Sequence, residues 1–190
     1  MNNNYFEDQQ FSGLTDSDIA VQYNEFEQCT FNNCDFSGMN FKAAKFTDCQ
    51  FNNCNLSMIN LTDISLNAVE FHNCKLTGVD FSLCNDFLLD VSFHQCLLNF
   101  VNFVKLPMAK TLFRGCQLHE ANFTQTDLSG AVFDECDLKY TIFERTNLTQ
   151  ADLSGAENYI INPEKSRIRN AKFALSGLPG LVAHYDIKIV

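Results

Sequence analysis

The stretch Phe31-Asn32-Asn33-Cys34-Asp35-Phe36 decides the fold, because it returns along the chain at nearly constant spacing. It recurs 20 residues later as Phe51-Asn52-Asn53-Cys54-Asn55-Leu56, and the same Phe-x-x-Cys core then begins at Phe71, Phe93, Phe113 and Phe133. The spacing is 20 residues at four of the five steps and 22 at the step from Phe71 to Phe93. A fixed period of this size indicates a repeat architecture in which each coil stacks on its neighbours.

The 20-residue period divides into four units of five. A large apolar residue stands at every fifth position from Phe26 to Phe81, and again from Leu88 to Leu153. A small or medium residue stands two positions before most of these centres, and eight of the nine cysteines take that place, the ninth being Cys84 within the slip. A period of five fits neither a strand nor an α-helix, whose periods are 2 and 3.6. Because the remaining positions are rich in turn-forming residues, the pattern predicts a square coil of four short sides.

The inward positions define the expected core. Six cysteines recur once per coil and should form a column of buried free thiols, since parallel side chains leave the Cβ atoms too far apart for disulfides. No CxxC pair typical of zinc sites occurs, so we expect no metal and no cofactor. The expected core stack consists of Phe31, Phe51, Phe71, Phe93, Phe113 and Phe133 with Cys34, Cys54, Cys74, Cys96, Cys116 and Cys136.

Composition limits the classes of function. The formal net charge of -10 argues against a general nucleic-acid binder, which needs clustered Lys and Arg. An acidic surface is typical of soluble proteins, but an acidic rod could also imitate DNA toward a DNA-binding protein. No apolar run is long enough to span a membrane. The first residues lack the basic and apolar regions of a signal peptide, so a cytoplasmic location is expected.

The chain is expected to have three parts. Residues 1–23 are weakly patterned and should form an N-terminal cap coil. Residues 24–173 carry the repeats, with a two-residue slip at 82–92. Residues 174–190 form an apolar tail that should cap the last coil or join two copies, through a short helix beginning near Pro179 and a short strand at 187–190. The possible dimer-interface residues are Leu175, Leu178, Leu181, Val182, Ile187 and Ile189.

The slip is the other irregular feature of the repeat region. Apolar residues near it fall at positions that should point outward, which indicates either local repacking or a patch that faces a partner. We expect Asn85, Asp86 and Phe87 to bulge from the coil near Phe100. The possible partner-binding residues are therefore Asn85, Asp86, Phe87 and Phe100.

Ala121-Asn122-Phe123-Thr124-Gln125 and Ala151-Asp152-Leu153-Ser154-Gly155 resemble pentapeptide repeats, whose consensus is Ala-(Asp/Asn)-Leu-x-x. The resemblance extends over about residues 24–173. It implies an all-β fold, a right-handed quadrilateral parallel β-helix. Fold alone does not define function.

No catalytic constellation is visible in the sequence, so we expect a protein without enzymatic activity. Within the pentapeptide repeat family, the layout resembles the quinolone-resistance (Qnr) proteins and the immunity proteins against microcin B17 and albicidin. That resemblance implies a homodimer, joined through its C-terminal ends, that imitates DNA and binds DNA gyrase or topoisomerase IV to protect it from a toxin or quinolone.

This chain has only a two-residue slip where the plasmid Qnr type has a long loop, which favours the immunity-type members. Two other functions stay open. One is a generic scaffold that presents a flat β face to an unknown protein partner, and the other is a self-assembling filament, which would need an uncapped end.

Overall fold

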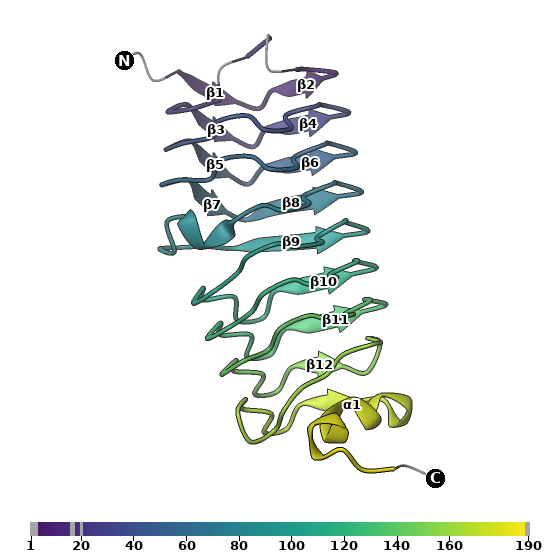
Figure 1. Cartoon of the computed structure of the whole chain (residues 1–190). Helices are drawn as coiled ribbons and strands as arrows, with labels where there is room; N and C mark the ends of the chain where they lie inside the picture. The colour runs from purple at the N-terminus through teal and green to yellow at the C-terminus, as the bar shows by residue number, and fades with distance from the viewer. Residues whose placement is uncertain (1–3, 16–17, 20, 189–190) are drawn as a thin grey trace.

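The computed structural model describes residues 4–15, 18–19 and 21–188. The chain winds into a parallel β-solenoid of about eight turns, a rod with the N-terminus at one end and the C-terminus at the other (Figure 1). This confirms the all-β, quadrilateral parallel β-helix expected from the five-residue period. Each coil has four faces, called A to D in chain order; Phe26, Phe31, Phe36 and Phe41 are the centres of faces A, B, C and D in one coil.

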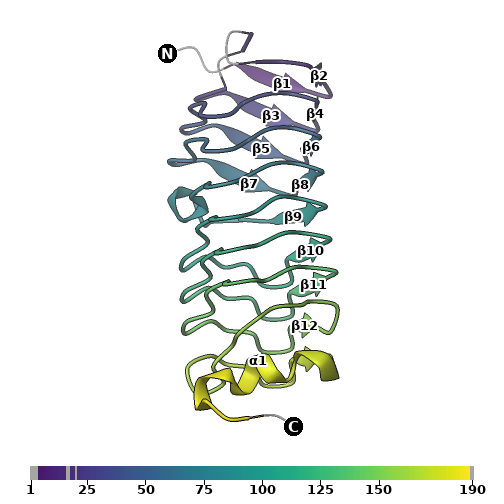
Figure 2. The same cartoon turned by 45° about the vertical axis from the view of Figure 1, so that its right-hand side comes forward.

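Two of the faces carry sheets, which lie side by side in Figure 2. Face A carries β1 (Tyr5–Glu7), β3 (Glu25–Glu27), β5 (Lys45–Thr47) and β7 (Ser65–Asn67), in that order. Face B carries β2 (Gln10–Ser12), β4 (Thr30–Asn32), β6 (Gln50–Asn52), β8 (Val69–His72), β9 (Val91–His94), β10 (Leu112–Arg114), β11 (Val132–Asp134), β12 (Asp152–Leu153) and β13 (Lys172–Phe173). On faces C and D, successive coils are joined by isolated parallel bridges, such as Asp35 to Asn55 on face C and Asn102 to Asn122 on face D.

The core is a stack of aromatic rings along the rod. On face B the rings of Phe31, Phe51, Phe71, Phe93, Phe113 and Phe133 stack with centroids 4.7–5.3 Å apart and planes within 14° of each other. Beside them lie the free, buried thiols of Cys34, Cys54, Cys74, Cys96, Cys116 and Cys136. The Sγ of Cys54 donates to the carbonyl of Phe31 in the preceding coil at 3.4 Å. In-register pairing of the strands thus aligns identical side chains from coil to coil.

The slip differs from the expected one. Leu88, expected as an inward centre, is 63% exposed and has a φ of 60°. The expectation for Leu88 is wrong because the five-residue frame that runs from Phe26 to Phe81 continues as far as Leu88. Counted in that frame, Leu88 falls at a corner. Asp86 therefore falls five residues after the buried Phe81 and is exposed, while Leu89 packs against the core in its coil. The sheet on face A ends at β7, and η1 (Phe81–Leu83) begins the irregular segment that follows it.

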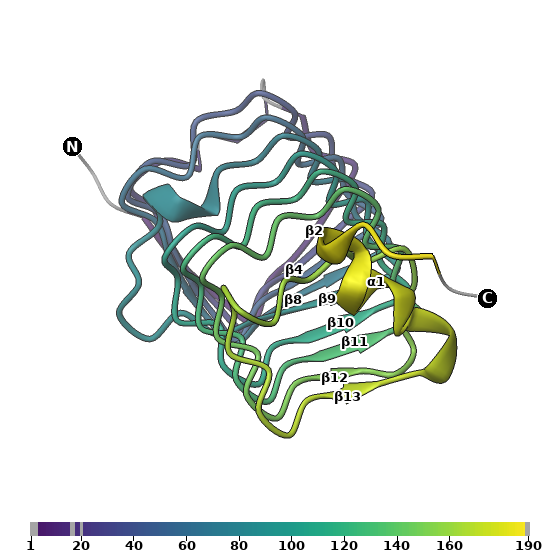
Figure 3. The same ribbon diagram turned by 60° about the horizontal axis from the view of Figure 1, so that its bottom comes forward.

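The C-terminal tail crosses the end of the rod (Figure 3). It consists of η2 (Leu175–Gly177), α1 (Pro179–Val182) and η3 (Ala183–Tyr185). The carbonyl of Gly180 accepts a hydrogen bond from the Ile161 N–H at 3.0 Å, and Leu181 packs against the core. The expected short helix is confirmed. Ile187 and Lys188 are not in a strand, and Ile189 and Val190 lie outside the described residues.

Candidate protein-binding surface

The corners of the coils have an unusual backbone. The second residue after nearly every centre has a positive φ, as in Asn33 at 54° and Asn53 at 55°. Asn and Gly tolerate this left-handed conformation best, whereas other side chains raise the conformational energy. Four corners nevertheless carry bulky apolar or aromatic side chains that are 56–69% exposed: Met58, Leu88, Phe100 and Tyr140. Because these side chains are large, apolar or aromatic and exposed, they are candidates for a surface that contacts a partner.

Three of these residues, Met58, Phe100 and Tyr140, lie at the corner between faces C and D. Phe100, Glu120 and Tyr140 occupy it on three successive coils. The N–H of Phe100 donates to the carbonyl of His119 at 2.9 Å, and that of Glu120 donates to the carbonyl of Lys139 at 3.0 Å, which ties each corner to the next coil. Beside this column lies a groove lined by Phe100, Val101, Asn102, Glu120, Asn122, Tyr140 and Ile142. We call it the corner groove.

The corner groove was only partly foreseen from the sequence, which singled out Phe100. Tyr140 is 67% exposed, Ile142 46% and Ile160, on the coil beyond, 59%. The five-residue frame could have identified them, since all three are large apolar or aromatic residues outside the centre positions. Their surroundings match the repeat well, however, and nothing like the slip drew attention to them.

The residues singled out at the slip lie elsewhere. Asn85, Asp86 and Phe87 are all exposed, and the Asn85 side chain accepts a hydrogen bond from the Phe87 N–H at 3.0 Å. Asn85 occupies the place on face A that Ser65 has in the preceding coil, because its N–H donates to the carbonyl of Ile64. Phe100, in contrast, lies at the corner between faces C and D. The expectation that Phe87 and Phe100 lie near each other is wrong, because a separation of 13 positions is about two thirds of a coil and places them near different corners.

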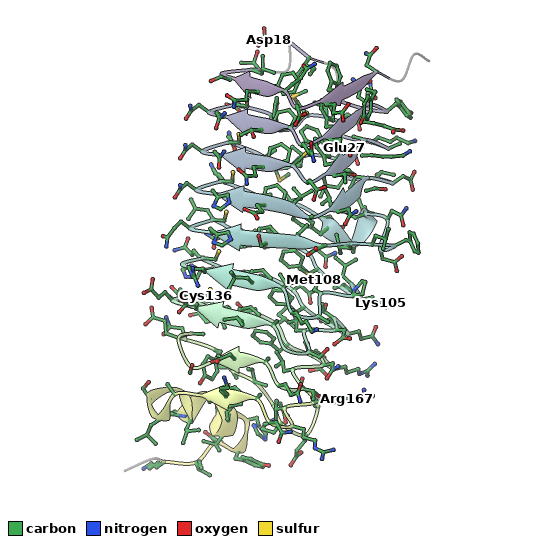
Figure 4. All side chains as sticks on the ribbon, turned by 180° about the vertical axis from the view of Figure 1, so that it is seen from behind. Asp18, Glu27, Lys105, Met108, Cys136 and Arg167 are labelled. Carbon is green, nitrogen blue, oxygen red and sulfur yellow. The ribbon has the colours of Figure 1, made fainter. Side chains whose placement is uncertain are left out.

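Charge is divided unevenly along the rod. Residues 1–100 contain 13 acidic and 3 basic residues, whereas residues 101–190 contain 10 of each. The N-terminal half therefore carries the whole net charge of -10, and the C-terminal half is neutral. Figure 4 shows Asp18 and Glu27 among the N-terminal coils and Arg167 near the opposite end.

The titratable groups of the described residues include buried thiols and a pair of stacked histidines. No group of three or more His, Cys, Asp or Glu in this part of the chain could hold a metal ion. Burial raises the pKa of the Cys49 thiol to about 11 and also raises the pKa of Cys84, so both thiols are protonated at neutral pH. The Nε2 atom of His72 lies 2.9 Å from a carboxylate oxygen of Glu70, and the His72 ring stacks on the His94 ring with centroids 4.5 Å apart.

None of the described helices has the length and apolar character needed to cross a membrane.

Two family models match the chain. One describes a pentapeptide repeat region and matches residues 24–103, and the other describes pentapeptide repeats in eight copies and matches residues 116–155. Together they include more than half of the sequence. The chain belongs to the pentapeptide repeat family. No curated protein sequence matches this pentapeptide repeat protein.

Solved structures of other pentapeptide repeat proteins resemble it in fold. Two trypsin-treated variants of QnrB1, a plasmid-mediated fluoroquinolone resistance protein, each match with a TM-score of 0.63. One is 20% identical, with 98% of this chain and 100% of that chain covered; the other is 19% identical, with 99% and 98% covered. HetL from the cyanobacterium Nostoc sp. strain PCC 7120 is 18% identical, with 90% and 86% covered and a TM-score of 0.41. At these identities, the QnrB1 likeness shows the fold.

Proposed function

We propose that this pentapeptide repeat protein is a non-enzymatic rod that binds a type II topoisomerase, DNA gyrase or topoisomerase IV, in place of DNA and protects it from a toxin or quinolone. The observation that carries the proposal is the concentration of the net charge in the N-terminal half of the rod. A surface that binds DNA is basic and would attract this half. The likeness in fold to QnrB1 supports the proposal. A cytoplasmic location follows from it.

The density of charge is close to that of DNA. One hundred residues make about five coils, which span about 24 Å at a strand spacing of about 4.8 Å. A net charge of -10 over this length is about one charge per 2.4 Å, compared with about one per 1.7 Å in duplex DNA. The acidic half therefore approaches the charge density of a duplex on a rigid protein frame. Electrostatic attraction of this kind speeds association and weakens with salt.

We expect purified DNA gyrase to bind the protein and to do so more weakly as salt is raised. A charge variant with Asp8→Asn, Asp48→Asn and Asp63→Asn should bind more weakly and show less salt dependence. These three residues occupy corners with φ values of 52–59°, a conformation that Asn tolerates, so the fold should be retained. The measurement is surface plasmon resonance at several salt concentrations, followed by a supercoiling assay in which the protein is titrated against a gyrase poison.

The matched control removes three charges from the neutral half, by Glu135→Gln, Glu144→Gln and Glu157→Gln. Its binding should change less than that of the Asp8, Asp48 and Asp63 variant. Absence of binding to gyrase and to topoisomerase IV at low salt, where the attraction is strongest, would rule out the proposal.

A second candidate function is a scaffold for a different protein partner. The corner groove favours it, because six of the seven residues that line the groove belong to the neutral half. A scaffold of this kind would have no effect on supercoiling at any concentration.

We further propose that residues 174–190 join two copies into a homodimer. The side of the tail that does not cap the rod presents Leu175, Leu178 and Ile187, which are 84%, 43% and 58% exposed. Leu181 and Val182 are half-buried beside them, and Ile189 lies outside the described residues. A two-fold axis would let each tail contact its own copy and would leave the acidic halves at the outer ends.

Leu175→Ser is expected to convert the dimer to a monomer without loss of the fold, since Leu175 makes little contact within its own chain. The measurement is light scattering over a range of protein concentrations, with the exposed Phe87→Ser as the control that should remain dimeric. A monomeric unmodified protein at micromolar concentration would contradict the proposal.

A further inference from the structure

The corner groove brings two aromatic rings and a carboxylate to one line along the rod. Phe100, Glu120 and Tyr140 occupy the same corner on consecutive coils, each with a φ of 55–61°. At about 4.8 Å per coil, Phe100 and Tyr140 are about 10 Å apart along the rod, with Glu120 halfway between them. Among the described residues, the Glu120 carboxylate has neither an ion-pair nor a hydrogen-bond partner.

This spacing suits a cation. A positive group held midway would lie about 5 Å along the rod from the corner that carries each ring, and cation–π attraction acts over roughly 6 Å. The chain itself shows that one of the rings accepts a cation, because the Lys139 ammonium lies 5.2 Å from the centroid of Tyr140. Glu120 would meet the charge of the incoming group, and the exposed Ile142 would cover its aliphatic stem.

We propose that Phe100, Glu120 and Tyr140 form a receptor for an arginine side chain of a partner protein. The planar guanidinium stacks on aromatic rings and pairs with a carboxylate at the same time, which suits it better than the compact, strongly hydrated ammonium of lysine. A purely apolar side chain does not fit, since it would cover the Glu120 carboxylate without a partner. An anionic group is repelled by the same carboxylate. The receptor depends on these three residues and not on the identity of the topoisomerase.

Nuclear magnetic resonance on the full-length protein with ¹³C-labelled aromatic rings tests the receptor directly. The probe is Nα-acetyl-arginine amide, and the matched neutral probe is Nα-acetyl-citrulline amide, which has nearly the same shape without the charge. The arginine probe should shift the ring resonances of Phe100 and Tyr140 in a saturable manner at millimolar concentration. The citrulline probe should shift them much less.

The variants follow from the backbone of the corner. Phe100→Gly and Tyr140→Gly place glycine where φ is 60° and 61°, so neither should unfold the protein. Each should weaken binding of the arginine probe about two- to fivefold, monitored on the remaining ring. Glu120→Gln should weaken it by a similar factor. The control is Met58→Gly, at the same corner on an earlier coil, with a φ of 58° and a side chain 69% exposed, and binding should be unchanged.

Three results would overturn the receptor. The first is an equal response to the arginine and citrulline probes, which would make the groove an apolar surface without charge recognition. The second is full binding by the Glu120→Gln variant. The third is the absence of any shift at Phe100 and Tyr140 at tens of millimolar probe. The titration uses no topoisomerase, so its failure is distinct from failure of the proposed DNA mimicry.

Discussion

Replacing Phe93 with alanine is expected to lower the free energy of unfolding by about 3–5 kcal/mol. The Phe93 ring is fully buried and stacks on Phe71 and Phe113, with centroids 5.3 Å away on either side. Phe81 and Phe103 meet it edge-on at 5.8 and 5.9 Å. The substitution leaves a cavity among four rings, and the hydrogen-bonded coils above and below hold those rings in place. Urea denaturation followed by circular dichroism measures the loss.

Phe87→Ala is the matched control, because it removes the same side chain from a site where it is 74% exposed. Its stability should stay within about 0.5 kcal/mol of the unmodified protein. If both variants lost stability equally, the face B stack would not be the main source of cohesion, and the segment at the slip would have a structural role that its exposure does not suggest.

Gly180→Ala is expected to displace the C-terminal tail from the last coil. A Cβ at this position would lie 2.0 Å from the carbonyl oxygen of Tyr159, a backbone atom that cannot rotate away. Relief of the clash moves the helix and breaks the hydrogen bond from the Ile161 N–H to the Gly180 carbonyl. We expect a loss of about 1–3 kcal/mol in stability, measured by thermal unfolding, and faster tryptic cleavage at Lys172.

Ser176→Ala is the control for this variant, since Ser176 belongs to the same tail and is exposed. It should have the stability and the cleavage rate of the unmodified protein. Unchanged cleavage at Lys172 in the Gly180→Ala protein would mean that the tail does not need its close approach to Tyr159.

The regular part of the fold could be predicted from the sequence because every coil repeats the same pattern of inward-facing residues. A large centre and a small residue two positions earlier fill the interior of one side, and the next five residues do the same. Phe31, Phe51 and Phe71 could therefore be assigned to one stack without any knowledge of tertiary contacts, and the structure aligns them in register.

Where the period breaks, the sequence left two registers open. Leu88 fits an inward centre when counted back from Phe93, and a corner when counted forward from Phe81. Asp86 and Leu88 are both exposed in the structure, and the positive φ of Leu88, like that of Ala68 one coil earlier, places Leu88 at a corner. The bond from the Asn85 N–H to the carbonyl of Ile64 joins residues 21 positions apart, as in the preceding coils, whereas the bond from the Asp90 N–H to the carbonyl of Leu66 joins residues 24 apart. The earlier register therefore holds at Asn85 and is lost before Asp90.

The surface was harder to predict than the core. The relation of Phe87 to Phe100 depends on the fraction of a coil between them, and one patch was expected where there are two surfaces. The column of Phe100, Glu120 and Tyr140 follows once the second residue after each centre is assigned to a corner. That corner conformation comes from the backbone, since its occupants include Met58 and Lys105 as well as Asn33 and Gly38.

The hydrogen bonds between coils join residues about 20 positions apart, as in the bond from the Asn53 N–H to the carbonyl of His72. A chain emerging from the ribosome can therefore complete each coil as soon as the next 20 residues or so are available, without waiting for distant segments. At every step before the last, the growing end is an open edge with unpaired backbone groups, and such edges promote aggregation. The tail that closes this edge is synthesised after all of the coils. A ribosome that stalls within residues 100–170 would thus hold a folded but uncapped rod, and release of that fragment should yield aggregates where release of the whole chain yields soluble protein.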